Sequence, residues 1–130
     1  MHSVDLNEGG VSSSVIALDR AIRKIGINSR ICTNPMDEQI KGKEKTGMVA
    51  HGLWQWPSLE AMRIHQKTKV PFVVFPHGML DPWFKKKYPL KHFKKQVYWW
   101  FRQGEILRQA NAVCFTTEEA KLLAQRTFWR

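Results

Sequence analysis

Residues 70–87 read VPFVVFPHGMLDPWFKKK, and this stretch does most to decide the fold. Residues 70–75 are apolar without interruption and mostly β-branched or aromatic, which is typical of a strand buried on both faces of a parallel sheet. The strand ends abruptly at Pro76, His77 and Gly78. Ligands of open α/β sheets bind in the crevice at the carboxyl ends of the strands. The sequence therefore places the imidazole of His77 where a ligand is expected.

Outside this stretch, helical and strand-like patterns alternate along the chain. Apolar residues three or four positions apart predict helices, and short apolar runs predict further strands. The predicted helices cover residues 11–25, 57–67 and 91–110, and a last helix contains Leu122 and Leu123. The predicted strands cover residues 28–33, 48–50, 70–75 and 112–115. This alternation predicts an α/β fold in which helices flank a Rossmann-like parallel sheet.

The two ends of the chain indicate an incomplete domain. A strand normally precedes a Gly-rich turn that leads into a helix, but residues 1–6 are few and poor in core side chains. A capping-box pattern at Thr116 and Glu119 opens the last helix, and no strand-like run follows that helix. We therefore expect one domain over residues 1–130 whose first strand is truncated.

Composition narrows the class of partner. A net charge of +10 on 130 residues indicates an anionic partner, whether nucleic acid, an acidic membrane surface or a phosphorylated substrate. The two cysteines, Cys32 and Cys114, stand in apolar, strand-like contexts, so we expect buried, reduced thiols in a cytoplasmic protein. Neither cysteine has metal-ligand spacing, and no metal site is expected. The sequence also shows no signal peptide, and no apolar run approaches the ~18 residues of a membrane span.

The Gly-rich turn Glu8-Gly9-Gly10 is the first candidate ligand site. Glycines allow a backbone to turn tightly and approach a ligand, and the amino end of the helix that follows attracts anions such as phosphate. An ordinary turn is the alternative interpretation. The chain contains neither GxGxxG nor GxxxxGK[ST], so a dinucleotide site and a P-loop lack support.

Two His-Gly pairs, His51-Gly52 and His77-Gly78, each follow a short apolar strand. Histidine titrates near neutral pH and either donates or accepts a hydrogen bond, which suits acid–base chemistry and substrate binding. A purely structural role is the alternative for each. The match between the two positions favours a functional site, with His77 ahead of His51. Asp81 follows shortly after and either caps the next turn or binds a hydroxyl group.

Residues 83–101 combine eight aromatic residues with six lysines and contain no acidic residue. The lysines are Lys85, Lys86, Lys87, Lys91, Lys94 and Lys95. Such a segment suits single-stranded nucleic acid, through stacking and charge, or an anionic membrane interface. Ordinary packing is the third interpretation, because Phe93, Val97 and Trp100 form one stripe of the predicted helix together with Leu107.

Taken together, these motifs resemble the amino-terminal half of a family 4 glycosyltransferase of the GT-B fold. The resemblance rests on Glu8-Gly9-Gly10 and the serine-rich helix after it, on HGLW at residues 51–54, and on PHGMLDPW at residues 76–83. Residues 108–127, which include CFTTE, also look like the strand and helix near the end of this domain in the family. The resemblance covers most of the chain, and PHGMLDPW is its most specific part.

The resemblance implies two Rossmann-like domains around a cleft, and transfer of a sugar from a nucleotide-sugar to a glycan or lipid-linked acceptor with retention of configuration. The nucleotide-sugar would be a co-substrate, with no cofactor and no essential metal. Gly9 and Gly10 would lie beside the donor diphosphate. His77 would be catalytic, facing the reacting sugar, with Gly78 beside it. His51 and Gly52 would line the acceptor side.

The carboxyl-terminal, donor-binding domain of such an enzyme is absent from these 130 residues, and that domain makes most donor contacts in the family. We therefore expect the chain alone to be inactive, and either a separate chain or a longer gene product to supply the second half. The basic aromatic segment would hold this cytoplasmic protein at the inner face of the plasma membrane, for polysaccharide or cell-envelope glycan synthesis. The alternative function is a basic aromatic nucleic-acid-binding module.

Overall fold

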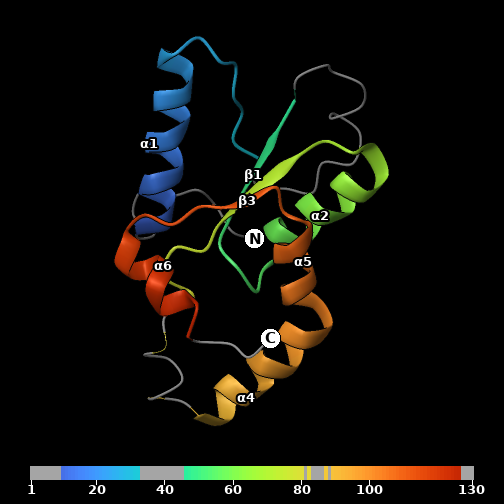
Figure 1. The fold of residues 1–130 in the computed structure, drawn as a ribbon. Helices are drawn as coiled ribbons and strands as arrows, with labels where there is room; N and C mark the ends of the chain where they lie inside the picture. The colour runs from blue at the N-terminus through green and yellow to red at the C-terminus, as the bar shows by residue number, and fades with distance from the viewer. Residues whose placement is uncertain (1–9, 33–45, 81, 83–86, 88, 127–130) are drawn as a thin grey trace. The chain divides into compact units, whose positions relative to one another are not determined.

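The computed structural model describes residues 10–32, 46–80, 82, 87 and 89–126, with no account of the side chains of residues 89–92. The chain divides into two compact units, Met1–Lys41 and Gly42–Arg130, which are described separately. Figure 1 labels their helices and strands. In the part of the chain that is described, no helix is long and apolar enough to cross a membrane.

The described part of the first unit is dominated by helix α1, Gly10–Lys24, as the sequence predicts. Asp19 and Arg23 form an ion pair of 2.9 Å one turn apart near its carboxyl end. A turn at Gly26 follows the helix, where the φ of Gly26 is +82°, in the left-handed region, and its N–H donates to the carbonyl of Arg23 at 3.0 Å. A glycine adopts this conformation without steric cost, which explains why the helix stops there.

The predicted strand at residues 28–33 is wrong for the residues that are described, because residues 28–32 form neither strand nor helix. Side chains of α1 hold this segment instead. The guanidinium of Arg23 donates to the carbonyl of Ser29, and the Ser29 hydroxyl donates to Asp19 at 2.6 Å. The prediction that Cys32 is buried is also wrong, because Cys32 is exposed.

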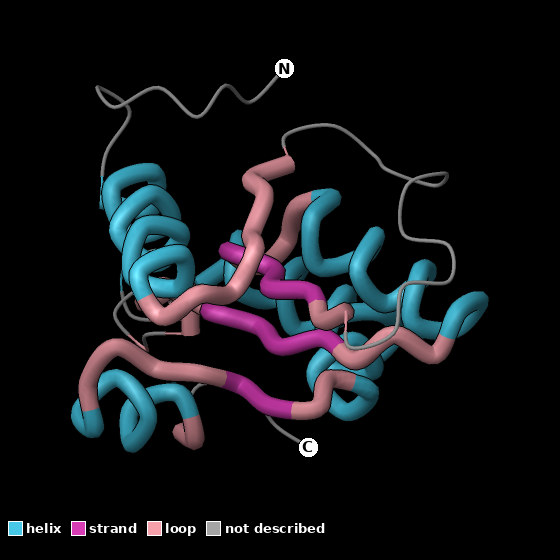
Figure 2. The backbone as a smooth tube through the Cα atoms, turned by 90° about the horizontal axis from the view of Figure 1, so that it is seen from above, coloured by secondary structure: helices cyan, strands magenta, loops and turns pink. Residues whose placement is uncertain are grey.

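The second unit is built on a parallel sheet in the order β1-β2-β3, formed by Met48–His51, Phe72–Phe75 and Ala112–Val113. Figure 2 shows these strands side by side. Helix α2, Trp56–Thr68, connects β1 to β2. Among the described residues of the connection from β2 to β3, helix α4, Pro89–Tyr98, continues into η1, Trp99–Gln103, and α5, Gly104–Gln109. Helix α6, Glu118–Ala124, follows β3. The predicted Rossmann-like α/β arrangement is confirmed.

The core lies on one face of this sheet. Phe72 and Val74 of β2 are fully buried against Ala61 and Met62 of α2 and Ile106 of α5. The alternate residues of β2 are half-buried, and Val49 of β1 is 41% exposed. The expectation that the central strand is buried on both faces is therefore correct for one face only.

The long helix predicted over residues 91–110 forms, but it contains a π-helical turn, η1. The N–H of Gly104 donates to the carbonyl of Trp99, five residues earlier, and a Cβ on Gly104 would lie 2.8 Å from that oxygen. This close approach requires glycine, because a methyl group would overlap the carbonyl.

The buried stripe of this helix also differs from the prediction. Phe93 is 64% exposed and Trp100 is 50% exposed, and Val97 is exposed as well. The stripe one residue earlier, Gln96, Gln103 and Ile106, is buried instead, with Trp99 partly buried beside it. Hydrophobicity alone pointed to the wrong stripe, because the buried stripe carries two glutamines.

The last helix begins one residue later than its capping pattern predicts. Thr117 is the N-cap, with extended backbone, and its hydroxyl accepts the N–H of Ala120 at 3.1 Å. The preceding strand is short, although Cys114 still donates its N–H to Val74 at 2.8 Å. Because the helix begins at Glu118, Thr117 rather than Thr116 occupies the N-cap position, and Glu119 falls within the first turn.

Candidate active site at the carboxyl edge of the sheet

Two histidines meet where β1 and β2 end. His51 is the last residue of β1 and lies opposite Phe75, the last residue of β2, and His77 follows two residues later. Because the two strands are parallel and in this register, His51 Nδ1 lies 2.9 Å from His77 Nε2. The two rings are stacked with their centroids 5.2 Å apart. The ring centroid of Phe75 lies 5.3 Å from that of His51 and 6.0 Å from that of His77.

A tight turn brings His77 into this position. The carbonyl of Pro76 accepts the N–H of Met79 at 3.0 Å, and the two residues between them have left-handed backbones, with φ of +48° at His77 and +73° at Gly78. Glycine takes this conformation freely, whereas for histidine it costs about 1–2 kcal/mol. Such strain persists only where surrounding contacts impose it, and it is concentrated at functional sites.

The loop after β1 is tied to the same turn. Gly52 donates its N–H to Phe75 at 2.8 Å and has a φ of +85°. A Cβ on Gly52 would lie 3.3 Å from Met79 Cε, so the two loops pack closely. The Met79 sulfur also accepts the N–H of Leu53 at 3.0 Å. Both His-Gly pairs are thus held by one interlocking set of contacts.

Both imidazoles are neutral near pH 7. Burial, together with the charge of His77, lowers the pKa of His51 to about 4, and burial also lowers the pKa of His77 below its ordinary value. In a neutral pair, one ring donates the proton of the shared hydrogen bond and the other accepts it. The two remaining nitrogens, His51 Nε2 and His77 Nδ1, are then one donor and one acceptor. A hydroxyl group, which both donates and accepts, matches such a pair.

Comparison with known proteins identifies the family. The family described as Glycosyl transferase 4-like domain matches residues 48–130, from the start of β1 through both histidines. The chain belongs to this glycosyltransferase family. No curated protein and no solved structure matches the chain. The parallel sheet with flanking helices is accordingly a Rossmann-like half of the GT-B architecture.

The remaining predicted ligand residues of this glycosyltransferase domain are only partly placed. Gly10 is the first residue of α1, exposed and with open space around it, and it belongs to the first unit, outside the family match. Gly9 and Asp81 lie outside the described residues. The structure therefore brings together His51, Gly52, His77 and Gly78, which all belong to the second unit.

The predicted basic segment is described in part. Lys85 and Lys86 lie outside the described residues, and Lys91 is placed on α4 without a described side chain. Lys87 and Lys94 are exposed. Lys95 is half-buried, and its ammonium lies 5.3 Å from the centroid of the Trp54 ring. Lys95 is therefore directed at the loop after β1.

Sequence reasoning gave no role to Gln103, and it noted Trp54 only as part of the HGLW motif, but the structure pairs the two residues. Trp54 has a left-handed backbone, with φ of +64°, and donates its N–H to Gln103 Oε1 at 3.2 Å. Gln103 is 1% exposed and comes from the π-helical turn. Trp54 was visible in the HGLW motif, whereas a glutamine in an amphipathic helix normally indicates a solvent-facing position.

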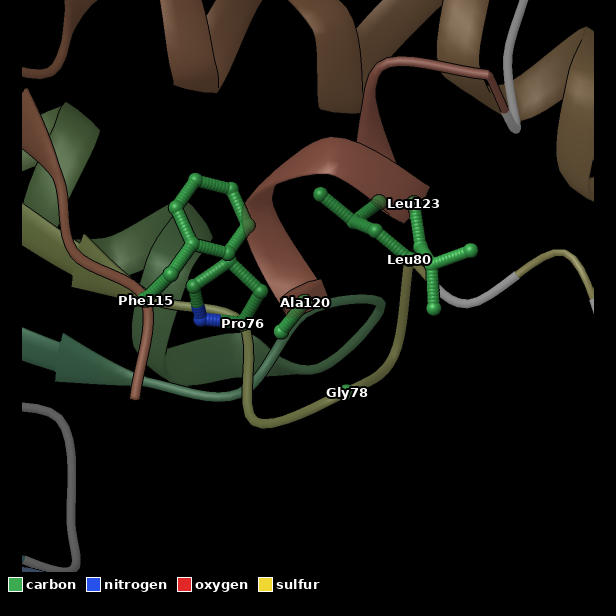
Figure 3. Close-up of a pocket in the computed structure, with 6 residues that line it drawn as sticks. All are labelled: Pro76, Gly78, Leu80, Phe115, Ala120 and Leu123. Carbon is green, nitrogen blue, oxygen red and sulfur yellow. The ribbon is translucent and has the colours of Figure 1, made fainter. Parts of the chain in front are cut away.

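A small apolar cavity lies behind the histidine turn (Figure 3). Its volume is about 20 Å³, and it is lined by Pro76, Gly78, Leu80, Phe115, Ala120 and Leu123. A space this small and apolar is a packing defect rather than a ligand pocket. Its lining places Ala120 and Leu123 of α6 next to Pro76 and Gly78 of the turn that carries His77. Across the described ranges, no three His, Cys, Asp or Glu side chains gather in a way that could hold a metal ion.

Proposed function

We propose that this domain is the acceptor-side half of a retaining hexosyltransferase. It would transfer a sugar from a nucleotide-sugar to a glycan or lipid-linked acceptor in polysaccharide or cell-envelope glycan synthesis. The observation that carries the proposal is the His51–His77 pair, held at the carboxyl edge of a parallel sheet in a glycosyltransferase 4-like domain. A second, donor-binding domain would close the cleft, from the same polypeptide or from a separate chain.

In this proposal, His77 acts as a neutral hydrogen-bonding group. Its outward nitrogen, Nδ1, would bind a hydroxyl of the reacting sugar and orient the ring, while His51 lies on the acceptor side and fixes the His77 tautomer. Gly52 and Gly78 keep the backbone free of side chains next to the reacting groups. Gly9 and Gly10 would lie beside the donor diphosphate at the amino end of α1. The reaction would need neither a metal nor a cofactor.

The exposed face of α4 and η1 supports peripheral attachment to an anionic membrane. Phe93, Val97, Trp100 and Phe101 are exposed on this helical stretch, and Lys94 lies among them. Exposed aromatic residues interleaved with lysines suit the headgroup region of a membrane whose lipids are acidic. We propose contact at the inner face of the plasma membrane, where lipid-linked acceptors are found. No finding favours the nucleic-acid alternative.

Ligand binding at the histidine pair tests the proposal. The full chain, with labelled histidine side chains, would be titrated with nucleotide-sugars such as UDP-glucose and GDP-mannose, and with lipid-linked oligosaccharides. We expect saturable changes in the NMR signals of His77 and His51 with at least one of these ligands. His65 is an internal control, because its ring is bound to the carbonyl of Val70 at 2.9 Å, away from the edge. Unchanged His77 signals with every ligand at millimolar concentration would contradict the proposal.

A further inference from the structure

A second hollow opens at the loop that follows β1. It has a volume of about 230 Å³ and is lined by Trp54, Lys94, Lys95 and Tyr98. Trp54 comes three residues after His51, and the other three residues come from α4. The lining therefore combines two aromatic rings with two cations and contains no acidic side chain.

The aromatic wall of the hollow is fixed in place. The Trp54 ring lies 6.0 Å from Tyr98 and 6.3 Å from Trp99, tilted against both. Its backbone is held in the left-handed region by the hydrogen bond to the buried Gln103. A bulky residue rarely takes this conformation, so the contacts around Trp54 impose the orientation of the ring. A preformed aromatic surface binds a ligand with little loss of side-chain entropy.

The cationic wall is partly removed from water. Lys95 is half-buried, with its ammonium over the Trp54 ring at 5.3 Å, and burial lowers its pKa. Lys94 lines the same hollow from the preceding position of α4. A cation with reduced hydration binds an anion more strongly than a fully solvated one. Phosphate is the anion that lysine side chains commonly bind in proteins.

We propose that this hollow is a subsite for a phosphorylated sugar of the acceptor substrate. The pyranose would lie against the rings of Trp54 and Tyr98, and its phosphate would bind Lys94 and Lys95. This inference rests on the proposed function, because it assigns the acceptor of that reaction. The phosphate could belong to a soluble sugar phosphate or to a lipid-linked sugar, and the two sources share this chemistry.

The test is a titration of the full chain with four probes, followed by the indole N–H signal of Trp54 in NMR spectra. The probes are glucose 1-phosphate, methyl glucoside, inorganic phosphate and dodecyl phosphate. We expect saturable binding of glucose 1-phosphate at Trp54, and binding about tenfold weaker for each probe that lacks the sugar or the phosphate. If dodecyl phosphate binds as tightly as glucose 1-phosphate, the hollow recognises a lipid phosphate and the sugar subsite is wrong.

Matched variants locate the binding. Lys95→Gln and Lys94→Gln should each weaken glucose 1-phosphate binding by about tenfold. Trp54→Gly removes the ring, and glycine adopts the left-handed backbone of this position without strain. Because this variant has no Trp54 signal, loss of glucose 1-phosphate binding is measured at the Lys95 side-chain signals. Lys121→Gln is the control, because Lys121 lies on α6 and pairs with Glu118. Equal binding by the Lys95 and Lys121 variants would overturn the subsite.

The two proposals fail in different ways. A response of His77 to a nucleotide-sugar, without any response of Trp54 to glucose 1-phosphate, would remove the subsite and leave the glycosyltransferase site intact. A response of Trp54 without any response of His77 would leave an anionic sugar site and contradict the proposed role of the histidine pair.

Discussion

The hydrogen bond between His51 and His77 couples the protonation of the two imidazoles. Each ring can shift its proton only if the other changes its tautomer as well, because Nδ1 of one faces Nε2 of the other at 2.9 Å. One added proton would turn both outward nitrogens into donors. The neutral pair therefore suits a hydroxyl group, whereas the protonated pair, with two outward donors, suits an anion.

The first prediction concerns acid stability. The pKa of His51 is lowered from 6.5 to about 4 in the folded chain, so the unfolded chain binds the proton more tightly. The free energy of unfolding should therefore be fully maintained above pH 6.5 and decrease as the pH falls from 6.5 toward 4. Thermal melts of the wild type and His51→Gln between pH 4.5 and 8 would measure this, and the variant should lose less stability on acidification. A His51 NMR titration with a midpoint near 6.5 would contradict it.

At the scale of the elements, the π-helical turn decides which residues reach the site. It places Gln103 Oε1 where it accepts the N–H of Trp54, and it allows the Trp99 ring to pack against the Trp54 ring. The turn depends on Gly104, whose N–H bonds to Trp99 across five residues. Such turns are uncommon and often occur at functional sites.

The second prediction is that Gly104→Ala destabilises the fold by about 1–3 kcal/mol, because the new methyl group would lie 2.8 Å from the Trp99 carbonyl oxygen. Urea denaturation would measure the loss, and the Trp54 indole signal should shift as η1 rearranges. Gly10→Ala is the matched control, since nothing lies within 4 Å of the added group on α1. Equal stability of the Gly104 variant and the wild type would rule out the π-helical turn.

The third prediction concerns the exposed face of α4 and η1. Vesicles that contain phosphatidylglycerol should bind the chain, and vesicles of phosphatidylcholine alone should bind it weakly. Phe101 is 79% exposed, so Phe101→Ser and Trp100→Ser should each reduce sedimentation with anionic vesicles several-fold. Leu122→Ser on α6 also removes an exposed apolar side chain and serves as the control. Binding that is identical for both lipid compositions would argue against an anionic membrane contact.

The elements show where sequence patterns were sufficient. The run at residues 72–75 and the helix at residues 56–68 were predictable, because their apolar residues are buried in the way the pattern requires. The exposure of the stripe that includes Phe93 was not predictable, because the adjacent stripe is buried instead and contains two glutamines. The sequence placed His51 and His77 each at the end of a strand, but their hydrogen bond depends on the strand register and the left-handed turn.

At the scale of the whole molecule, the second unit holds both the histidine pair and the hollow at Trp54. The family match begins at Met48, and both the histidine pair and the Trp54 hollow lie within it. The Gly-rich turn belongs to the first unit, so its proposed contact with the donor diphosphate rests on the sequence resemblance. The net charge of +10 favours anionic ligands for the chain as a whole.

The fourth prediction follows from the charge that glycosyl transfer develops. The departing diphosphate needs positive charge or aligned donors, whereas the His51–His77 pair is neutral near pH 7. This chain alone should therefore transfer no sugar from UDP-glucose or GDP-mannose at pH 7, and a donor-binding domain added in trans should produce turnover that His77→Ala abolishes. Radiolabelled transfer to a lipid-linked acceptor would measure it. Turnover by the purified chain alone, lost in His77→Ala and therefore not due to a contaminant, would show that this unit stabilises the leaving group without help.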